Sequence, residues 1–159
     1  MSFSGQNKNR IYQDDIIRTV GMMFADGRRR LTIQCPTGSG KTRIAVQLVN
    51  KMGSRRVLYT VPSTEIFAQT SEKLDELGVQ HLKLEAGAKP DPQGHSVILA
   101  MSQTLARRTS SAMFDVWEPD VIFIDEIHKL IEQHRNITTL WKCPIIGMTA
   151  APVRLDGKN

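Results

Sequence analysis

The chain has 159 residues, 40% of them hydrophobic and 23% charged, which is typical of one globular domain and argues against a disordered chain. No apolar run reaches the length of a membrane span, and the polar N-terminus lacks the apolar core of a signal peptide, so we expect a cytoplasmic protein, or a nuclear one in a eukaryote, without membrane contact. The net charge of +5 comes from residues 1–60, which hold 11 Lys or Arg against 3 Asp or Glu, and such a basic region attracts polyphosphates or nucleic acid.

Strands and helices alternate along the chain. In chain order, the apolar spacing and the Gly and Pro residues predict a helix at 12–24, a strand at 31–35, a helix at 42–52, a strand at 57–61, a helix at 64–77 and a weak strand at 79–84. They then predict a loop at 85–95, a strand at 96–100, a helix at 103–117 broken near 110–111, a strand at 121–124, a helix at 127–140 and a strand at 144–148. Continuously apolar strands joined by helices form parallel sheets that are buried on both faces. We therefore predict an α/β fold of three layers, α/β/α, with a mostly parallel sheet that binds ligands at the carboxyl ends of its strands.

A glycine-rich segment, Pro36-Thr37-Gly38-Ser39-Gly40-Lys41-Thr42, follows a predicted strand and opens a predicted helix. In that position its glycines let backbone N–H groups surround phosphate oxygens, and the helix N-terminus adds partial positive charge. Lys41 would bind the terminal phosphates and the Thr42 hydroxyl would ligate Mg²⁺. The segment therefore predicts a phosphate-binding loop for ATP with Mg²⁺ that consists of Thr37, Gly38, Ser39, Gly40, Lys41 and Thr42, although Cys35 stands where the general pattern has its first Gly.

Two carboxylates, Asp125 and Glu126, follow the apolar run at 121–124. Carboxylates at the end of a buried strand are costly unless they serve a cation. We expect Asp125 to hold the Mg²⁺ of the nucleotide, and Glu126 to orient and deprotonate the attacking water. An acidic pair at a helix N-terminus is the alternative, and the phosphate loop earlier in the chain favours the catalytic interpretation.

The segment Asp125-Glu126-Ile127-His128 resembles the Asp-Glu-x-His box of superfamily-two helicases, in the branch that contains excision-repair helicases, RadD-like proteins and restriction-enzyme motors. Further segments match in order, so that the resemblance covers about residues 10–157 and implies a RecA-like phosphate-loop NTPase domain. It assigns roles to residues outside the two motifs above: adenine recognition to Gln13, contact with a nucleic-acid strand to Pro62, Ser63, Gln103 and Thr104, and coupling of hydrolysis to strand movement to His128, Thr149 and Ala150. His128 is expected to form a hydrogen bond with Thr149, whereas Ala151 stands where the family usually has a hydroxyl. Ser63 has a simpler alternative role as a helix N-cap.

Motors of this family resemble pairs of RecA-like lobes with ATP between them. Residues 1–159 correspond to the first lobe, and we expect the second, which supplies arginine fingers, to be absent from this chain. The predicted function is the ATP-binding lobe of an ATPase or helicase that acts on DNA or RNA, with DNA slightly favoured. Two alternatives stay open, namely another phosphate-loop NTPase or kinase and a non-catalytic nucleic-acid-binding module. Stimulation of turnover by nucleic acid would argue against the first alternative, and nucleotide binding would argue against the second.

Overall fold

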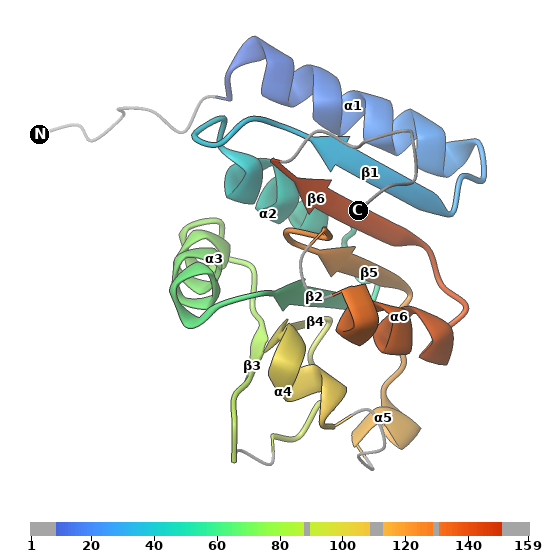
Figure 1. The fold of residues 1–159 in the computed structure, drawn as a ribbon. Helices are drawn as coiled ribbons and strands as arrows, with labels where there is room; N and C mark the ends of the chain where they lie inside the picture. The colour runs from blue at the N-terminus through green and yellow to red at the C-terminus, as the bar shows by residue number, and fades with distance from the viewer. Residues whose placement is uncertain (1–8, 88–89, 109–112, 129–130, 151–159) are drawn as a thin grey trace, which may run out of the picture.

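Six parallel strands form one sheet in the computed structural model, which describes residues 9–87, 90–108, 113–128 and 131–150, without the side chains of 131–134 (Figure 1). The order across the sheet is β1-β6-β5-β2-β4-β3. The strands are β1 (Arg30–Gln34), β2 (Val57–Val61), β3 (Leu82–Leu84), β4 (Val97–Met101), β5 (Val121–Ile124) and β6 (Ile145–Thr149). Because every pair is parallel, all carboxyl ends meet at one edge, which lies on the left in Figure 1.

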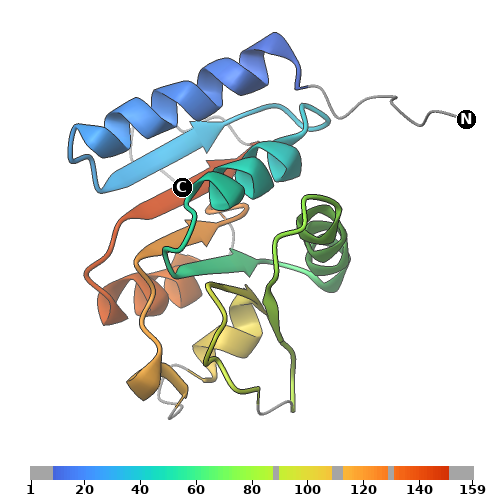
Figure 2. The same ribbon diagram turned by 180° about the vertical axis from the view of Figure 1, so that it is seen from behind.

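Helices cover both faces of the sheet. The first face packs against α1 (Ile11–Ala25), α2 (Lys41–Lys51) and α3 (Thr64–Glu76), and the second against α4 (Ser102–Ala106), α5 (Met113–Val116) and α6 (Ile131–Leu140). Figures 1 and 2 show these layers from opposite sides. Neighbouring strand residues alternate between the faces, so that Tyr59 and Phe123 join the first core cluster whereas Leu58 and Ile122 join the second. Each of these four side chains has no exposed surface. Strands β2 and β5 are buried at every position, whereas β1 and β3 keep polar residues on their exposed positions.

The ends of the helices follow the expected local chemistry. The Ser63 side chain caps α3 by accepting a hydrogen bond from the backbone N of Ile66 at 3.3 Å. Strands β2 and β5 coincide with their predicted ranges, and most other elements differ from prediction by one or two residues. No helix in the described ranges is long and apolar enough to cross a membrane.

Three predicted elements are wrong in extent. Residues 125–128 form a turn and α6 begins at Ile131. The backbone N of Ile127 donates to Met148 O of β6 at 2.9 Å, which holds this turn against the sheet. The weak strand at 79–84 shortens to β3, since the N–H of Val79 donates to Leu74 O at the end of α3. The helix at 103–117 is replaced by the short helices α4 and α5, and the predicted break at 110–111 lies outside the described residues.

Candidate active site

The carboxyl edge of the sheet brings the sequence motifs together in a fixed order. The phosphate loop follows β1, Thr149 ends β6, Asp125 follows β5, Pro62 follows β2, and Ser102 follows β4. Since the sheet order is β1-β6-β5-β2-β4 over these strands, the residues expected to bind nucleotide occupy one half of the edge. The segments expected to contact nucleic acid occupy the adjoining half.

The phosphate loop has the backbone shape that its glycines permit. Gly38 and Gly40 have φ angles of 78° and 84°, a left-handed conformation that side chains disfavour. The backbone N of Ser39 donates to Pro36 O at 3.1 Å, and α2 begins directly after Gly40. The Ser39 hydroxyl is buried and has no hydrogen-bond partner among the described residues. An unsatisfied hydroxyl of this kind suits a polar ligand such as a phosphate chain.

Gln13 of α1 forms a hydrogen bond with the phosphate loop. Its Nε2 donates to Ser39 O at 3.0 Å, and its Oε1 accepts from the backbone N of Arg10 at 3.0 Å. A Cβ at Gly40 would lie 2.6 Å from Gln13 Nε2, so a side chain at this position would force the Gln13 amide to move away from the loop. The Tyr12 hydroxyl also donates to Ser39 O, at 2.5 Å. The family resemblance assigned the segment at residues 10–13 to adenine recognition through Gln13 and gave Tyr12 no role of its own. The structure shows Gln13 buried, with 4% exposure, and hydrogen-bonded to the phosphate loop.

Lys41 and Glu126 form an ion pair across the sheet edge. Lys41 Nζ donates to Glu126 Oε1 at 2.5 Å, and both side chains are only 13% exposed. Strand β6 lies between β1 and β5, the strands that precede these two residues, so the ion pair joins segments that follow strands roughly 10 Å apart. Glu126 has a φ of 51°, which is uncommon for a residue other than glycine and is often found where function fixes a side chain.

Asp125 is held at the end of β5 with 4% exposure. Its backbone N donates to Thr60 O at 2.9 Å, and its Oδ1 accepts from the Glu126 backbone N at 2.9 Å. Burial, and secondarily the negative charge of Asp125, raise the pKa of Tyr59 well above its usual value of 10.0, so this phenol stays neutral. Because α6 begins only at Ile131, Asp125 and Glu126 do not lie at a helix N-terminus. The alternative interpretation of this acidic pair is therefore wrong.

The oxygen ligands near the loop fit a magnesium ion bound together with a nucleotide. Magnesium in such sites takes one or two protein oxygens and completes its shell with phosphate oxygens and water. The buried carboxylate of Asp125 and the half-buried Thr42 are hard oxygen donors of this kind. The described residues contain no group of three or more His, Cys, Asp or Glu that could hold a metal.

His128 connects the acidic motif to the end of β6. Its Nδ1 lies 2.7 Å from the Thr149 hydroxyl and 3.3 Å from Glu126 Oε2. The expected His128–Thr149 hydrogen bond is therefore present.

The carbonyl of Thr149 accepts from the backbone N of Cys35 at 3.0 Å, so Cys35 continues the pairing of β1 with β6. Contacts thus run from Lys41 through Glu126 and His128 to Thr149. Ala150 follows at the surface of this edge with partial exposure, and Ala151 lies outside the described residues.

The segments expected to contact nucleic acid lie next to each other, because β2 pairs with β4. Ser102 Oγ donates to Val61 O at 3.3 Å and ties the two strand ends together. Pro62 and Ser63 are half-buried and Gln103 is exposed, whereas Thr104 is 7% exposed. Gln103 can therefore reach a ligand from solvent, and Thr104 is mostly enclosed by protein.

Two basic clusters lie elsewhere. Residues 28–30 lie at the start of β1, of which Arg30 is the first residue, and Arg55 and Arg56 precede β2, so both clusters are at the amino edge, opposite the motifs. Arg56 is engaged by Asp120, whose Oδ2 accepts from the Arg56 backbone N at 2.7 Å and whose Oδ1 lies 3.3 Å from Arg56 Nη2. These hydrogen bonds lower the pKa of Asp120. The positive charge noted in the sequence is therefore not concentrated at the candidate site.

Residues 6–154 match the family model described as type III restriction enzyme, res subunit. Similar proteins include IRC3 of Saccharomyces cerevisiae, a candidate ATP-dependent helicase, with 28% identity over 92% of this chain and 24% of its own length. They also include the DNA 3'-5' translocase XPB2 of Sulfurisphaera tokodaii, with 30% identity over 82% of this chain and 29% of its own length. The chain thus spans less than a third of either relative.

Solved structures show the same fold. The SWI2/SNF2 ATPase core of Sulfolobus solfataricus in complex with dsDNA matches 92% of this chain and 32% of its own chain with a TM-score of 0.76 at 17% identity. The Hef helicase domain of Pyrococcus furiosus matches 92% of this chain and 34% of its own chain with a TM-score of 0.68 at 23% identity. The predicted three-layer, RecA-like α/β fold is confirmed.

Proposed function

The chain belongs to the family described as type III restriction enzyme, res subunit, and from this premise we propose that it is the ATP-binding lobe of a nucleic-acid-dependent ATPase or helicase. Residues 1–159 form one domain in this proposal. ATP is the cofactor that the ATP-dependent relative suggests, and Mg²⁺ is the metal that the oxygen donors favour.

The observation that carries the proposal is the ion pair between Lys41 and Glu126 at 2.5 Å. It places the cation of a phosphate loop beside a carboxylate that follows a buried strand. A terminal phosphate attracted by Lys41 would therefore lie within reach of the Glu126 carboxylate. Phosphoryl transfer to water is favoured by this juxtaposition of a phosphate-binding cation and a group that orients water and can accept its proton.

In the proposed reaction the loop residues 37–42 hold the triphosphate through backbone N–H groups and the Lys41 ammonium. Asp125 and Thr42 would bind Mg²⁺. When bound, this ion would neutralise negative charge on the phosphates. Glu126 exchanges its contact with Lys41 for a water molecule, orients that water in line with the γ-phosphate and takes its proton. The left-handed backbone at Glu126 supports this role because it fixes the direction of the carboxylate. Gln13 then has two proposed roles, loop support and adenine recognition.

The adjoining half of the edge is proposed to contact one strand of nucleic acid through Pro62, Ser63, Gln103 and Thr104. Gln103 is the most accessible of these. Thr149 and Ala150, together with His128, are proposed to pass the state of the nucleotide to these segments, because His128 contacts both Glu126 and Thr149. DNA is the first candidate, since one relative is named a DNA translocase and one structural neighbour holds dsDNA. RNA remains the alternative.

A second RecA-like lobe is the partner that this proposal requires. The relatives are several times longer than the part matched by this chain, so that movement along nucleic acid is proposed for the assembled protein.

The test of the proposal is ATP turnover by this chain together with a second lobe, with and without single-stranded or duplex DNA or RNA. We expect phosphate release to rise on addition of nucleic acid and to disappear in the Glu126→Gln variant. Transfer of the γ-phosphate to a small molecule instead of water would favour the kinase alternative. Nucleic-acid binding without nucleotide binding would favour the non-catalytic module.

A further inference from the structure

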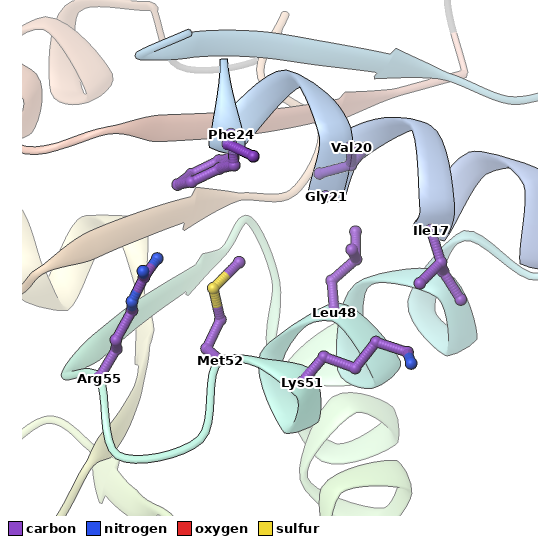
Figure 3. A pocket seen from close by; sticks show the side chains of 9 residues that line it. Ile17, Val20, Gly21, Phe24, Leu48, Lys51, Met52 and Arg55 are labelled. Carbon is purple, nitrogen blue, oxygen red and sulfur yellow. The ribbon is translucent and has the colours of Figure 1, made fainter. Parts of the chain in front are cut away.

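A groove of about 370 Å³ lies between α1 and the end of α2, near the amino edge of the sheet. Figure 3 shows Ile17, Val20 and Phe24 of α1 on one side and Leu48 and Met52 on the other. The groove is separate from the candidate active site, because the motif residues all lie at the carboxyl edge.

The floor of the groove is apolar and partly open to solvent. Val20 and Leu48 are buried in the first core cluster, while Phe24 and Met52 pack against it and remain half-buried. Gly21 also lines the groove, and a Cβ at this position would meet nothing within 4 Å. The open space therefore continues to the backbone of α1, which leaves room for side chains of another molecule.

The rim of the groove is positively charged. Lys51 and Arg55 line it and are exposed, and neither forms an ion pair with a carboxylate in the part of the chain that the structure describes. Arg55 acts more distantly on Asp120, whose pKa it helps to lower. Unpaired cations beside half-buried apolar side chains favour a partner that offers apolar and acidic groups together.

We propose that this groove binds an acidic amphipathic helix of a protein partner. Apolar side chains spaced i, i+3 or i+4, and i+7 on such a helix would fill the space beside Gly21 between Phe24 and Met52. Its carboxylates would face Lys51 and Arg55. The apolar floor distinguishes this occupant from nucleic acid, which would contact the cationic rim and leave the floor exposed.

The test uses the 159-residue chain and a synthetic helical peptide of roughly 16 residues, long enough to form a helix. The peptide carries leucines at i, i+4 and i+7 with glutamates beside that face. A second peptide has the same composition in scrambled order, and a third has lysine in place of each glutamate. Fluorescence anisotropy should show saturable binding of the first peptide only. No binding of the acidic peptide at roughly millimolar concentration, the weak limit of specific recognition, would overturn the proposal.

Two groups of variants locate the binding. Gly21→Leu should fill the groove and weaken peptide binding by about tenfold or more, while the melting temperature stays equal or rises because leucine favours a helix. Lys51→Glu combined with Arg55→Glu should weaken binding by roughly three- to tenfold. Lys83→Glu in β3, a single charge reversal at an exposed position far from the groove, should leave binding unchanged.

Three other results would overturn the proposal, because each would assign the groove to another occupant or the peptide to another site. If the rim variants lose affinity for duplex DNA while the acidic peptide does not compete, the surface binds nucleic acid. If sedimentation shows a dimer of the chain that Gly21→Leu dissociates, the occupant is a second copy. Peptide binding that Gly21→Leu leaves unchanged would place the peptide elsewhere.

Discussion

Lys41 and Glu126 are 85 positions apart in the chain, yet Lys41 Nζ lies 2.5 Å from Glu126 Oε1. The pair connects the phosphate loop to the acidic motif across the end of β6. Binding of ATP would replace this contact with one between Lys41 and phosphate, which would release the carboxylate for water. The first two predictions separate these two roles.

Replacement of Lys41 by alanine removes the cation of the phosphate loop. We expect Mg-ATP binding to weaken by about tenfold or more, the loss of a charge-assisted contact of about 1.5–3 kcal/mol. Isothermal titration calorimetry measures the affinity. Lys83→Ala, which removes an exposed lysine from β3, is the matched control and should bind ATP normally. An unchanged affinity in the Lys41 variant would argue against the phosphate-loop assignment.

Glu126→Gln keeps the shape of the side chain and removes its negative charge. ATP affinity should be retained or increase slightly, because Lys41 loses its competing ion pair, whereas hydrolysis in the two-lobe protein should be lost. Glu76→Gln is a suitable control, since Glu76 also pairs with a lysine, Lys73 at 2.8 Å, but on the surface of α3. Wild-type turnover in the Glu126 variant would assign water activation to another group.

The sequence predicts the strands better than the site geometry. Strands β2 and β5 were located correctly because each is a buried apolar run that a polar residue or proline terminates. Residues 127–128 were mistaken for the start of a helix, whereas they belong to a turn. The bond from Ile127 N to Met148 O that holds this turn is a tertiary contact, which local periodicity does not contain. The Lys41–Glu126 contact was also missed, since it depends on the insertion of β6 between β1 and β5.

Support of the phosphate loop by Gln13 could have been inferred only in part. A glutamine upstream of a phosphate loop suggests a polar contact, but its direction depends on the packing of α1 against α2. The 2.6 Å approach of Gln13 Nε2 to a Cβ position at Gly40 is a feature of that packing. The His128–Thr149 hydrogen bond, by contrast, was expected from the resemblance to superfamily-two helicases and is present at 2.7 Å.

Thr149→Val should test the proposed coupling, because it removes the hydroxyl that contacts His128 and preserves the volume of a residue that is 2% exposed. In the two-lobe protein we expect ATP affinity within about twofold of wild type. Stimulation of turnover by nucleic acid should fall by roughly tenfold, a change that corresponds to a typical coupling free energy between two sites. Thr139→Val on the exposed side of α6 serves as the control. Normal stimulation in the Thr149 variant would show that the hydrogen bond carries no coupling.

The contact between Arg56 and Asp120 should make stability depend on acid pH. Hydrogen bonds from Arg56 lower the pKa of Asp120 in the folded protein, so the stabilisation is present above the unfolded pKa of about 3.9. It is lost as the pH falls through the folded pKa. Because both side chains are more than 40% exposed, Asp120→Asn should lower the free energy of unfolding by only about 1 kcal/mol or less at neutral pH. Urea unfolding should show this difference disappearing near pH 2. A difference that is the same at both pH values would exclude the charge of Asp120 as its cause.

The last prediction concerns the chain by itself. The proposed site holds nucleotide with Lys41 and activates water with Glu126, but arginine fingers from a second lobe contribute on the order of 10³–10⁵ to the rate of related phosphoryl transfers. Unwinding also requires two bodies that close and open around the nucleotide while they hold one strand. Residues 1–159 alone should therefore fold and bind adenine nucleotide modestly, with little ATPase activity, with or without nucleic acid, and no strand separation. Addition of a second RecA-like lobe should restore ATPase activity and strand separation.

A fluorescent duplex-unwinding assay measures strand separation directly, and sedimentation verifies that the chain is a monomer. Robust ATP-dependent unwinding by the monomeric chain would mean that the proposed site is complete without a second lobe.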